Sequence, residues 1–282
     1  MEIKDVIGIE KPLTKLIEVC ADGIKGVCAP WQMRRLARAE ADKSLILQDA
    51  DIQKMITRAE TEEFLQTRRE KRQADNLSKI VDVAYIETRR KKEVSRQAVD
   101  ADWSARFFDY AQDVSDEAIQ VIWGKILAGE VERLGRFSKR TLALLRNLSK
   151  SEGEYFVELS RYVILYAVVA ENDILFSSYP SSKVRSLSDA GLLNLSPVDA
   201  TFEIIDRKFM IGDLCVFVEP DSIKKMRNVI FKSFLLTRSA LELYDLMETQ
   251  TPDPEYVIYF LSRLKKAGVK LRTSNEVLNR ML

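Results

Sequence analysis

Histidine, the residue that most often acts as a general base or binds a metal, does not occur in this chain of 282 residues. The three cysteines, Cys20, Cys28 and Cys215, are widely spaced and match no zinc motif. They are too few for a disulfide framework, which favours a reducing, cytoplasmic location. The glycines form neither G-x-x-x-x-G-K nor G-x-G-x-x-G, the loops that cradle phosphates. We therefore expect no cofactor and no metal site.

One set of charged residues could still do chemistry, as the centre of a Mg²⁺-dependent nuclease. Such enzymes hold Mg²⁺ between carboxylates on adjacent strands and place a lysine beside the attacking water. Asp199, Asp206 and Lys208 fit this pattern on a predicted hairpin, with Glu203 nearby. However, charged residues make up 31% of the chain, so the pattern also arises by chance. An ordinary solvated hairpin is the favoured interpretation, and we assign no catalytic residue.

Residues 1–31 predict a short amphipathic segment with apolar side chains at helical spacing. Lysines on its polar face would allow residues 11–28 to lie on a membrane surface, but neighbouring acids oppose anionic lipid. Packing on the protein's own core or on a partner subunit is therefore the favoured interpretation. The apolar residues are Leu13, Leu16, Ile17, Cys20, Ile24 and Val27.

Residues 32–100 predict a long helical arm with coiled-coil-like patterning. Strong helix formers fill this stretch, and residues 31–123 include no glycine or proline. Apolar residues recur at heptad-like spacing, although polar stretches interrupt them twice. An amphipathic helix of this length must cover its apolar stripe, so it either pairs with another chain or folds back as a hairpin. We favour homo-oligomerisation through Leu45, Ile52, Ala59, Leu77, Val81 and Ala84.

Two basic clusters lie on the same arm, at residues 68–72 and 89–92. They could hold phosphates, but glutamates occupy nearby helical positions and would pair with them. Lysine and arginine total 44, and aspartate and glutamate total 43, so net charge gives no attraction to nucleic acid or anionic membrane. A solvated helix face is the favoured interpretation.

Residues 101–170 predict a helical core, because aromatic residues are dense at its start. A helix is expected to begin at 115–117, with Gly129 placed to end it. Ser138 is expected to cap the next helix. A capping box at 151–154 is expected to open a third.

Residues 171–282 predict an α+β region of winged-helix type. A short helix ending at Gly191 precedes strand-like runs at 192–195, 201–209 and 214–218. In a winged helix, the helix before the sheet enters the DNA major groove, and the wing contacts phosphates. Acids lie among the few cations available, so we weigh a protein partner above DNA. The candidate nucleic-acid-binding residues are Lys183, Arg185, Arg207 and Lys208.

Two phrases in the helical core carry a family resemblance. Residues 123–130 read W-x-K-I-L-A-G-E, and residues 138–149 read S-x-R-T-L-x-x-L-x-x-L-S. A later phrase at 236–243 reads L-T-x-x-A-x-E-L. With these phrases the chain resembles a family of uncharacterised bacterial proteins, domain of unknown function 2806. The resemblance implies no established activity, and its residues look structural, with Trp123, Ile126 and Leu127 as core.

The sequence therefore predicts a mainly α protein with a smaller α+β part: a long helical arm, a helical core and a winged-helix-like region. We expect a non-enzymatic, oligomerising binding protein. A winged-helix DNA-binding protein is the alternative, and a metal-dependent nuclease is the remotest one. A sensor-like module joined to an amphipathic end also suggests a role in prophage or antiviral defence.

Overall fold

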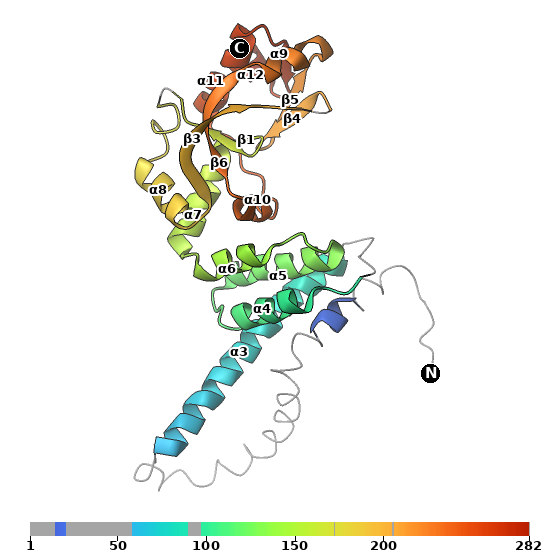
Figure 1. Ribbon diagram of the computed structural model, residues 1–282, viewed down its shortest axis with the longest axis vertical. Helices are drawn as coiled ribbons and strands as arrows, with labels where there is room; N and C mark the ends of the chain where they lie inside the picture. Colours follow the sequence, from blue (N-terminus) through green and yellow to red (C-terminus); the bar gives the residue numbers. More distant parts are fainter. Residues whose placement is uncertain (1–14, 21–57, 90–96, 172, 205, 282) are drawn as a thin grey trace, which may run out of the picture. The chain divides into compact units, whose positions relative to one another are not determined.

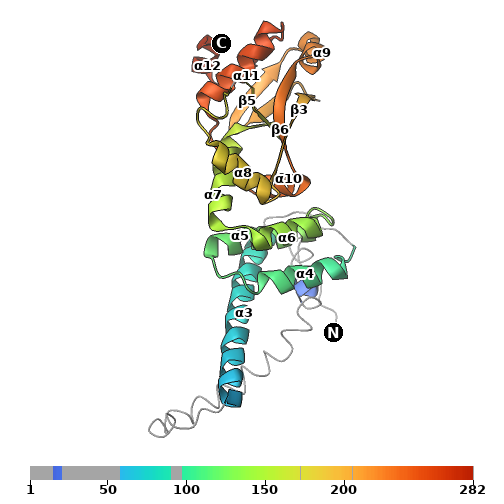
Figure 2. The same ribbon diagram turned by 60° about the vertical axis from the view of Figure 1, so that its left-hand side comes forward.

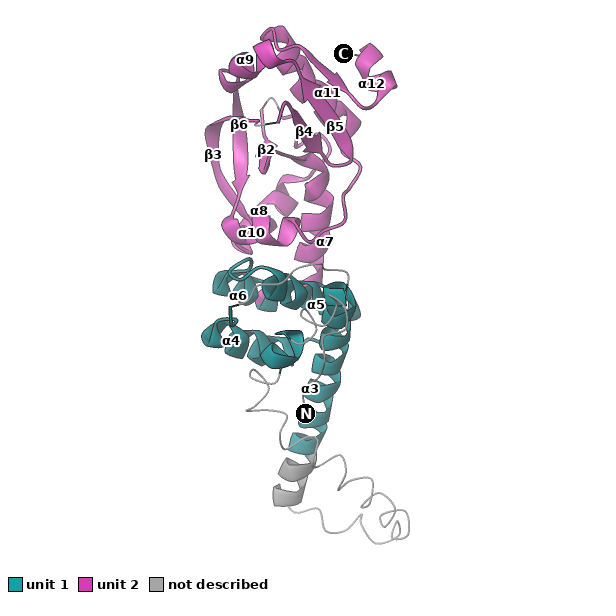
Figure 3. Ribbon diagram, turned by 90° about the vertical axis from the view of Figure 1, so that its right-hand side faces the viewer, with its two compact units in different colours: residues 1–146 teal, residues 147–282 magenta. Residues whose placement is uncertain are grey.

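The computed structural model describes residues 15–20, 58–89, 97–171, 173–204 and 206–281. The chain divides into two compact units, unit 1 (Met1–Arg146) and unit 2 (Asn147–Leu282), coloured separately in Figure 3. Unit 1 is helical, and unit 2 combines helices with two antiparallel sheets. The expectation of a mainly helical chain with a smaller α+β part is confirmed. None of the described helices is long and apolar enough to cross a membrane.

Unit 1 is built on one long helix. This helix, α3, packs along α5 and also contacts α4. Its N-terminal half extends beyond the other helices of the unit (Figures 1 and 2). The longer helices of unit 1 are α3 (Arg58–Arg89), α4 (Ala101–Ala111), α5 (Glu117–Glu132) and α6 (Lys139–Asn147).

Side-chain caps begin the helices where the sequence indicates. Asp116 accepts hydrogen bonds from the backbone N–H groups of the first turn of α5. The Ser138 hydroxyl accepts one from Thr141 N at 3.3 Å, as expected for the cap of α6. The prediction that Gly129 ends α5 is wrong, because α5 continues to Glu132. Gly129 instead makes room for Phe137, whose Cε2 would lie 2.7 Å from an added Cβ.

The core of unit 1 is aromatic, as predicted. Trp103 and Phe107 stack with ring centroids 5.2 Å apart, and Phe107 meets Trp123 edge-on at the same distance. Trp123, Ile126 and Leu127 are completely buried. In the short helix at 15–20, Leu16 and Val19 are also buried while Ile17 is exposed. This segment therefore packs on its own unit.

A close helix crossing joins α3 to α5. An added Cβ at Gly124 would lie 2.9 Å from the Ile80 carbonyl oxygen and 2.5 Å from Val83 Cβ. Beside this crossing, Gln120 Nε2 donates to Asn76 Oδ1 at 3.2 Å. Asn76 Nδ2 in turn donates to the Gln112 carbonyl at 2.9 Å. A glycine contact and a buried amide network therefore set the position of α3 along α5.

Unit 2 has two separate antiparallel sheets with helices around them. The first has strand order β1-β2-β6-β3, and the second has order β4-β5-β7. Its strands are β1 (Val163–Ile164), β2 (Ala167–Val169), β3 (Leu193–Thr201), β4 (Lys208–Ile211), β5 (Leu214–Val218), β6 (Ile230–Leu236) and β7 (Leu271–Thr273). Its helices are α7 (Lys150–Leu159), α8 (Ser181–Asp189), α9 (Ile223–Arg227), α10 (Arg238–Tyr244), α11 (Pro254–Lys266) and α12 (Glu276–Met281).

Three local predictions for this part of the chain were wrong. The capping box of α7 is formed by Ser149 and Glu152, two residues before the predicted position. Residues 163–169, expected to be helical, form the β1–β2 hairpin, because this β-branched run folds back through a two-residue turn. The separate runs expected at 192–195 and 201–209 are also wrong, because β3 continues from Leu193 to Thr201, and a register shift accommodates its proline.

The expected winged-helix sheet is divided between the two sheets. β3 pairs with β6, whereas β4 pairs with β5 in the other sheet. The structure therefore does not confirm a winged helix.

Aromatic rings between the sheets and α11 form the core of unit 2. The Phe260 ring on α11 lies 4.8 Å from that of Phe231 on β6 and 6.3 Å from that of Phe209 on β4. The buried Tyr256 hydroxyl donates to the Val169 carbonyl at 3.1 Å. α11 begins at Pro254 after the Asp253 cap, an arrangement that favours the start of a helix. This core holds β4, the strand that borders the cavity described next.

Candidate functional site

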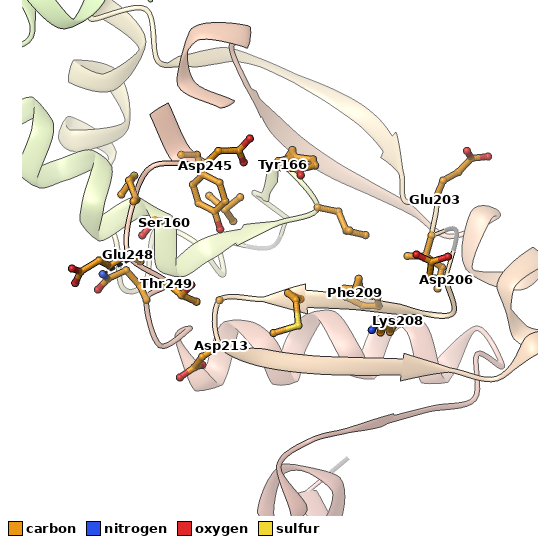
Figure 4. A pocket seen from close by; sticks show the side chains of 18 residues that line it. Ser160, Tyr166, Glu203, Asp206, Lys208, Phe209, Asp213, Asp245, Glu248 and Thr249 are labelled. Atoms are coloured by element: carbon orange, nitrogen blue, oxygen red, sulfur yellow. Dashed lines mark hydrogen bonds between the residues drawn. The ribbon is translucent and has the colours of Figure 1, made fainter. Parts of the chain in front are cut away.

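A cavity of about 770 Å³ lies in unit 2 (Figure 4). We call it the acidic pocket. Three parts of the chain surround it: the β1–β2 turn, the start of β4 with its preceding loop, and the segment after α10. Its size is within the range of ligand sites in proteins.

The floor of the acidic pocket is apolar. Val163, Ile204 and Phe209 are buried there. Met210, which is 51% exposed, and the half-buried Met247 also line the cavity. Methionine side chains are flexible and polarisable, and they adapt to apolar groups of varied shape.

Five carboxylates surround this apolar floor. Asp213, Asp245 and Glu248 lie toward one end of the cavity, and Glu203 and Asp206 toward the other (Figure 4). Glu203 pairs with Arg227 at 3.2 Å, and Asp213 accepts from Thr251 Oγ1 at 3.2 Å. Within the described residues, the other three make no side-chain ion pair or hydrogen bond. The cavity therefore has a negative rim with one lining cation, Lys208.

An unusual turn places two large side chains at the cavity. Leu165 and Tyr166 connect β1 to β2 with φ of 46° and 69°. Turns of this kind normally carry asparagine and glycine, because other side chains are strained at positive φ. Both side chains line the acidic pocket, and Tyr166 is 54% exposed. The turn thus presents an aromatic ring beside the carboxylates.

A second tyrosine, Tyr244, lines the cavity at the end of α10. Burial, together with Tyr166 and Asp245 nearby, raises the pKa of Tyr244, so its hydroxyl stays protonated. That hydroxyl makes no hydrogen bond within the described part of the chain. Tyr244 can therefore donate a hydrogen bond to a bound group.

A glycine allows the third wall of the acidic pocket, the segment after α10, to pack closely. Gly212, in the β4–β5 turn, has φ of 55°. An added Cβ there would lie 2.1 Å from the Gln250 carbonyl oxygen. The segment after α10 therefore packs directly on the turn, which brings Glu248 and Asp213 to the same cavity.

The protein-family comparison can now be placed beside this geometry. The model for the protein of unknown function DUF2806 matches residues 58–205. The chain belongs to this family. The match confirms the resemblance inferred from residues 123–149, and it extends from α3 into the first part of the pocket. No curated protein and no solved structure matches the chain.

In this DUF2806 chain, the nuclease pattern is not assembled. Asp199 on β3 pairs with Lys232 at 3.2 Å, within the four-stranded sheet. Lys208 begins β4, in the other sheet. The predicted hairpin joining them is therefore wrong. No group of three metal-ligating side chains occurs among the residues that the structure describes.

The predicted DNA-binding residues differ in whether they already have partners within the chain. Lys183 on α8 forms an ion pair with Glu158 and lies over the Tyr155 and Tyr179 rings. The other three, Arg185, Arg207 and Lys208, are exposed. The helix that should enter the groove thus presents one unpaired cation rather than two.

The predicted oligomerisation stripe is partly accounted for within the chain. Leu77 and Ala84 are buried in unit 1, on the part of α3 that packs along α5. Val81 is half-buried. Leu45 and Ile52 lie outside the described residues, as does the side chain of Ala59. Of the basic clusters, Arg72 pairs with Asp113, which follows α4, at 3.3 Å, and not with a nearby glutamate of its own helix.

Sequence reasoning missed the principal lining residues of the pocket. Tyr166, Tyr244 and Asp245 belong to no recognisable motif, and they meet only because β2 and β6 pair. One signal was present: the run of residues 162–170 is too short for a membrane span and rich in β-branched residues. It could have indicated a hairpin, but no turn residue marks its centre.

Proposed function

We propose that this chain is a non-enzymatic binding protein whose acidic pocket receives a protein segment with basic and apolar side chains. The observation that carries the proposal is the pocket itself, an apolar floor beneath five carboxylates, three of which lack partners within the described residues. A lysine or arginine of the partner would pair with the rim while a neighbouring apolar side chain enters the cavity.

The composition of the pocket favours a peptide over a small metabolite. Tyr166 and Met210 are both about half exposed, at 54% and 51%. Exposed aromatic and methionine side chains are common anchors of protein interfaces. The rim charges would add specificity and association rate more than affinity.

The test is selection of binding peptides from a random library displayed on phage, using the full-length chain as target. We expect enrichment of peptides that place lysine or arginine next to aliphatic or aromatic residues. For the best peptide, Asp245→Asn with Glu248→Gln should weaken binding about three- to tenfold, measured by calorimetry. Asp189→Asn, an exposed acid on α8 outside the pocket, is the matched control and should change nothing. Enrichment of peptides without basic residues, or equal affinity in all variants, would refute the proposal.

The other functions suggested by the sequence have weaker support. A winged-helix mode of DNA binding is supported by the exposed Arg185 on α8, but Lys183 is already paired with Glu158.

Self-association through α3 is supported by Leu65, which is 58% exposed on the projecting half of this helix. Light scattering tests self-association: a mass of 32.4 kDa would mean a monomer. A role in antiviral defence has only the sequence argument, and phage plating with and without the protein tests it.

A further inference from the structure

A row of three exposed side chains crosses the whole second sheet of unit 2. In the strand register, Lys208 on β4 lies opposite Phe217 on β5. Phe217 in turn lies opposite Arg272 on β7. Cross-strand partners lie on the same face of a sheet, so the three form one line, which we call the Lys–Phe–Arg row.

This face of the sheet is turned toward solvent. Residues on β4 and β5 alternate between buried and less buried positions, and Phe217 is 37% exposed between two exposed cations. The opposite face carries Phe209 and Val216, which are buried in the core. A hollow of about 770 Å³, lined also by Arg207 and Pro220, lies along the row.

Charge on this face is mainly positive. The cations are Arg207, Lys208 and Arg272, and the acids lining the same hollow are Asp206 and Glu219. Glu219 is 3.7 Å from Lys270, which offsets its charge. The Arg207 carbonyl accepts from Val218 N at 2.8 Å, so its backbone is tied to β5 beside Phe217.

The Phe217 ring already contacts one planar cation. Arg272 Cζ lies 5.3 Å from the ring centroid, a cation–π contact. A flat guanidinium on an exposed ring is a surface on which a nucleobase can stack. When Arg272 turns outward to a phosphate, the ring itself becomes available to a base.

From the Lys–Phe–Arg row we infer that this sheet binds single-stranded nucleic acid. Bases stack on Phe217 or on the Arg272 guanidinium, while Lys208 and Arg207 neutralise the flanking phosphates. A duplex is excluded as the preferred ligand because its bases are stacked on one another and cannot reach a ring on a flat sheet. The site shares Asp206 and Lys208 with the acidic pocket but differs from it, since neither Phe217 nor Arg272 lines that cavity.

The experiment is fluorescence anisotropy of a labelled thymidine 12-mer and a uridine 12-mer with the full-length chain at low salt. We expect binding of one or both, with log affinity falling linearly with log salt concentration. Phe217→Ala should weaken binding about tenfold or more, and Phe217→Leu, which keeps an apolar side chain, should weaken it similarly. Lys208→Gln and Arg207→Gln should each reduce the salt slope by about 0.7.

Two matched controls separate the row from general surface effects. Phe176 is also 37% exposed but lies elsewhere in unit 2, so Phe176→Ala should leave binding unchanged. Lys224→Gln, on α9, removes an exposed cation outside the row. Circular dichroism confirms the folding of each variant. The inference is overturned by absence of binding at low salt, by equal affinity for a duplex or heparin, or by affinity insensitive to both Phe217 substitutions.

Discussion

At the scale of single residues, the turn formed by Leu165 and Tyr166 is the clearest conflict between local preference and structure. Each residue has a positive φ, a conformation that costs a side-chain-bearing residue roughly 1–2 kcal/mol. The turn persists because β2 pairs with both β1 and β6, which leaves only two residues to reverse the chain. Such strain is often found where side chains are held for a function.

We predict that Tyr166→Gly is more stable than Tyr166→Ala by about 0.5–1 kcal/mol. Both variants lose the half-exposed ring, but only glycine adopts positive φ without a steric penalty, which exceeds its greater chain entropy in the unfolded state. Urea unfolding of the two variants measures the difference. Both should also weaken peptide binding in the acidic pocket. Alanine equal to or better than glycine would show that the turn is not strained.

At the scale of elements, the contact between α3 and α5 defines unit 1. The helices approach so closely at Gly124 that an added methyl group would meet backbone and side-chain atoms of α3. Asn76 and Gln120 form a buried hydrogen bond beside this contact. A sliding motion of one helix would break that bond, so α3 has one favoured position along α5.

Two glycine substitutions should have opposite effects. Gly124→Ala should destabilise unit 1 by about 1–3 kcal/mol, because the new Cβ would lie 2.9 Å from the Ile80 carbonyl. Gly153→Ala in α7 should stabilise by about 0.5–1 kcal/mol, since the nearest atom is Leu148 Cδ2 at 4.0 Å and alanine is the better helix former.

Thermal unfolding followed by circular dichroism measures both variants. If both variants were destabilised, the loss in Gly124→Ala could not be assigned to the α3–α5 contact. A Gly124→Ala variant as stable as the parent chain would contradict the close crossing itself.

At the scale of the whole molecule, the side chains that gain or lose a proton do so mainly outside the neutral pH range. The chain has no histidine, whose ordinary pKa would place a charge change between pH 5 and 8. Four tyrosines of unit 2 instead titrate abnormally. Burial raises the pKa of Tyr179 and Tyr256 well above the ordinary value, and that of Tyr162 and Tyr244 less strongly.

We predict that unit 2 loses stability as the pH rises above about 10. The unfolded chain releases these phenolic protons near its ordinary pKa, whereas the folded chain retains them, so unfolding becomes more favourable with rising pH. Tyr179 and Tyr256, whose pKa values are raised most, should contribute most to this loss of stability.

Urea unfolding at pH 9 and 11, with tyrosine absorbance at 295 nm, tests this prediction. The absorbance should show part of the nine tyrosines ionising only when the chain unfolds. Ionisation of all of them near pH 10 in a chain that stays folded would contradict it.

Much of the local structure could be predicted because its causes are local. The caps at Ser138 and Asp253 act within one helical turn, and the aromatic cluster around Trp123 lies on two consecutive helices. The errors occurred where residues distant in the sequence determine the local structure. Gly129 resembles a helix stop but accommodates Phe137, and residues 163–169 form strands because β6 is beside them.

The sequence by itself determined the family, the helical character of residues 58–89 and 101–147 and the absence of histidine chemistry, since these follow from residue type and short-range spacing. Only the tertiary structure decided that the strands divide into two sheets and that α3 packs along α5. It also decided that Tyr166, Tyr244 and Asp245 share a cavity, and that Lys208, Phe217 and Arg272 form a row. Strand pairing joins residues far apart in the chain, and the free energy of that pairing depends on all partners at once.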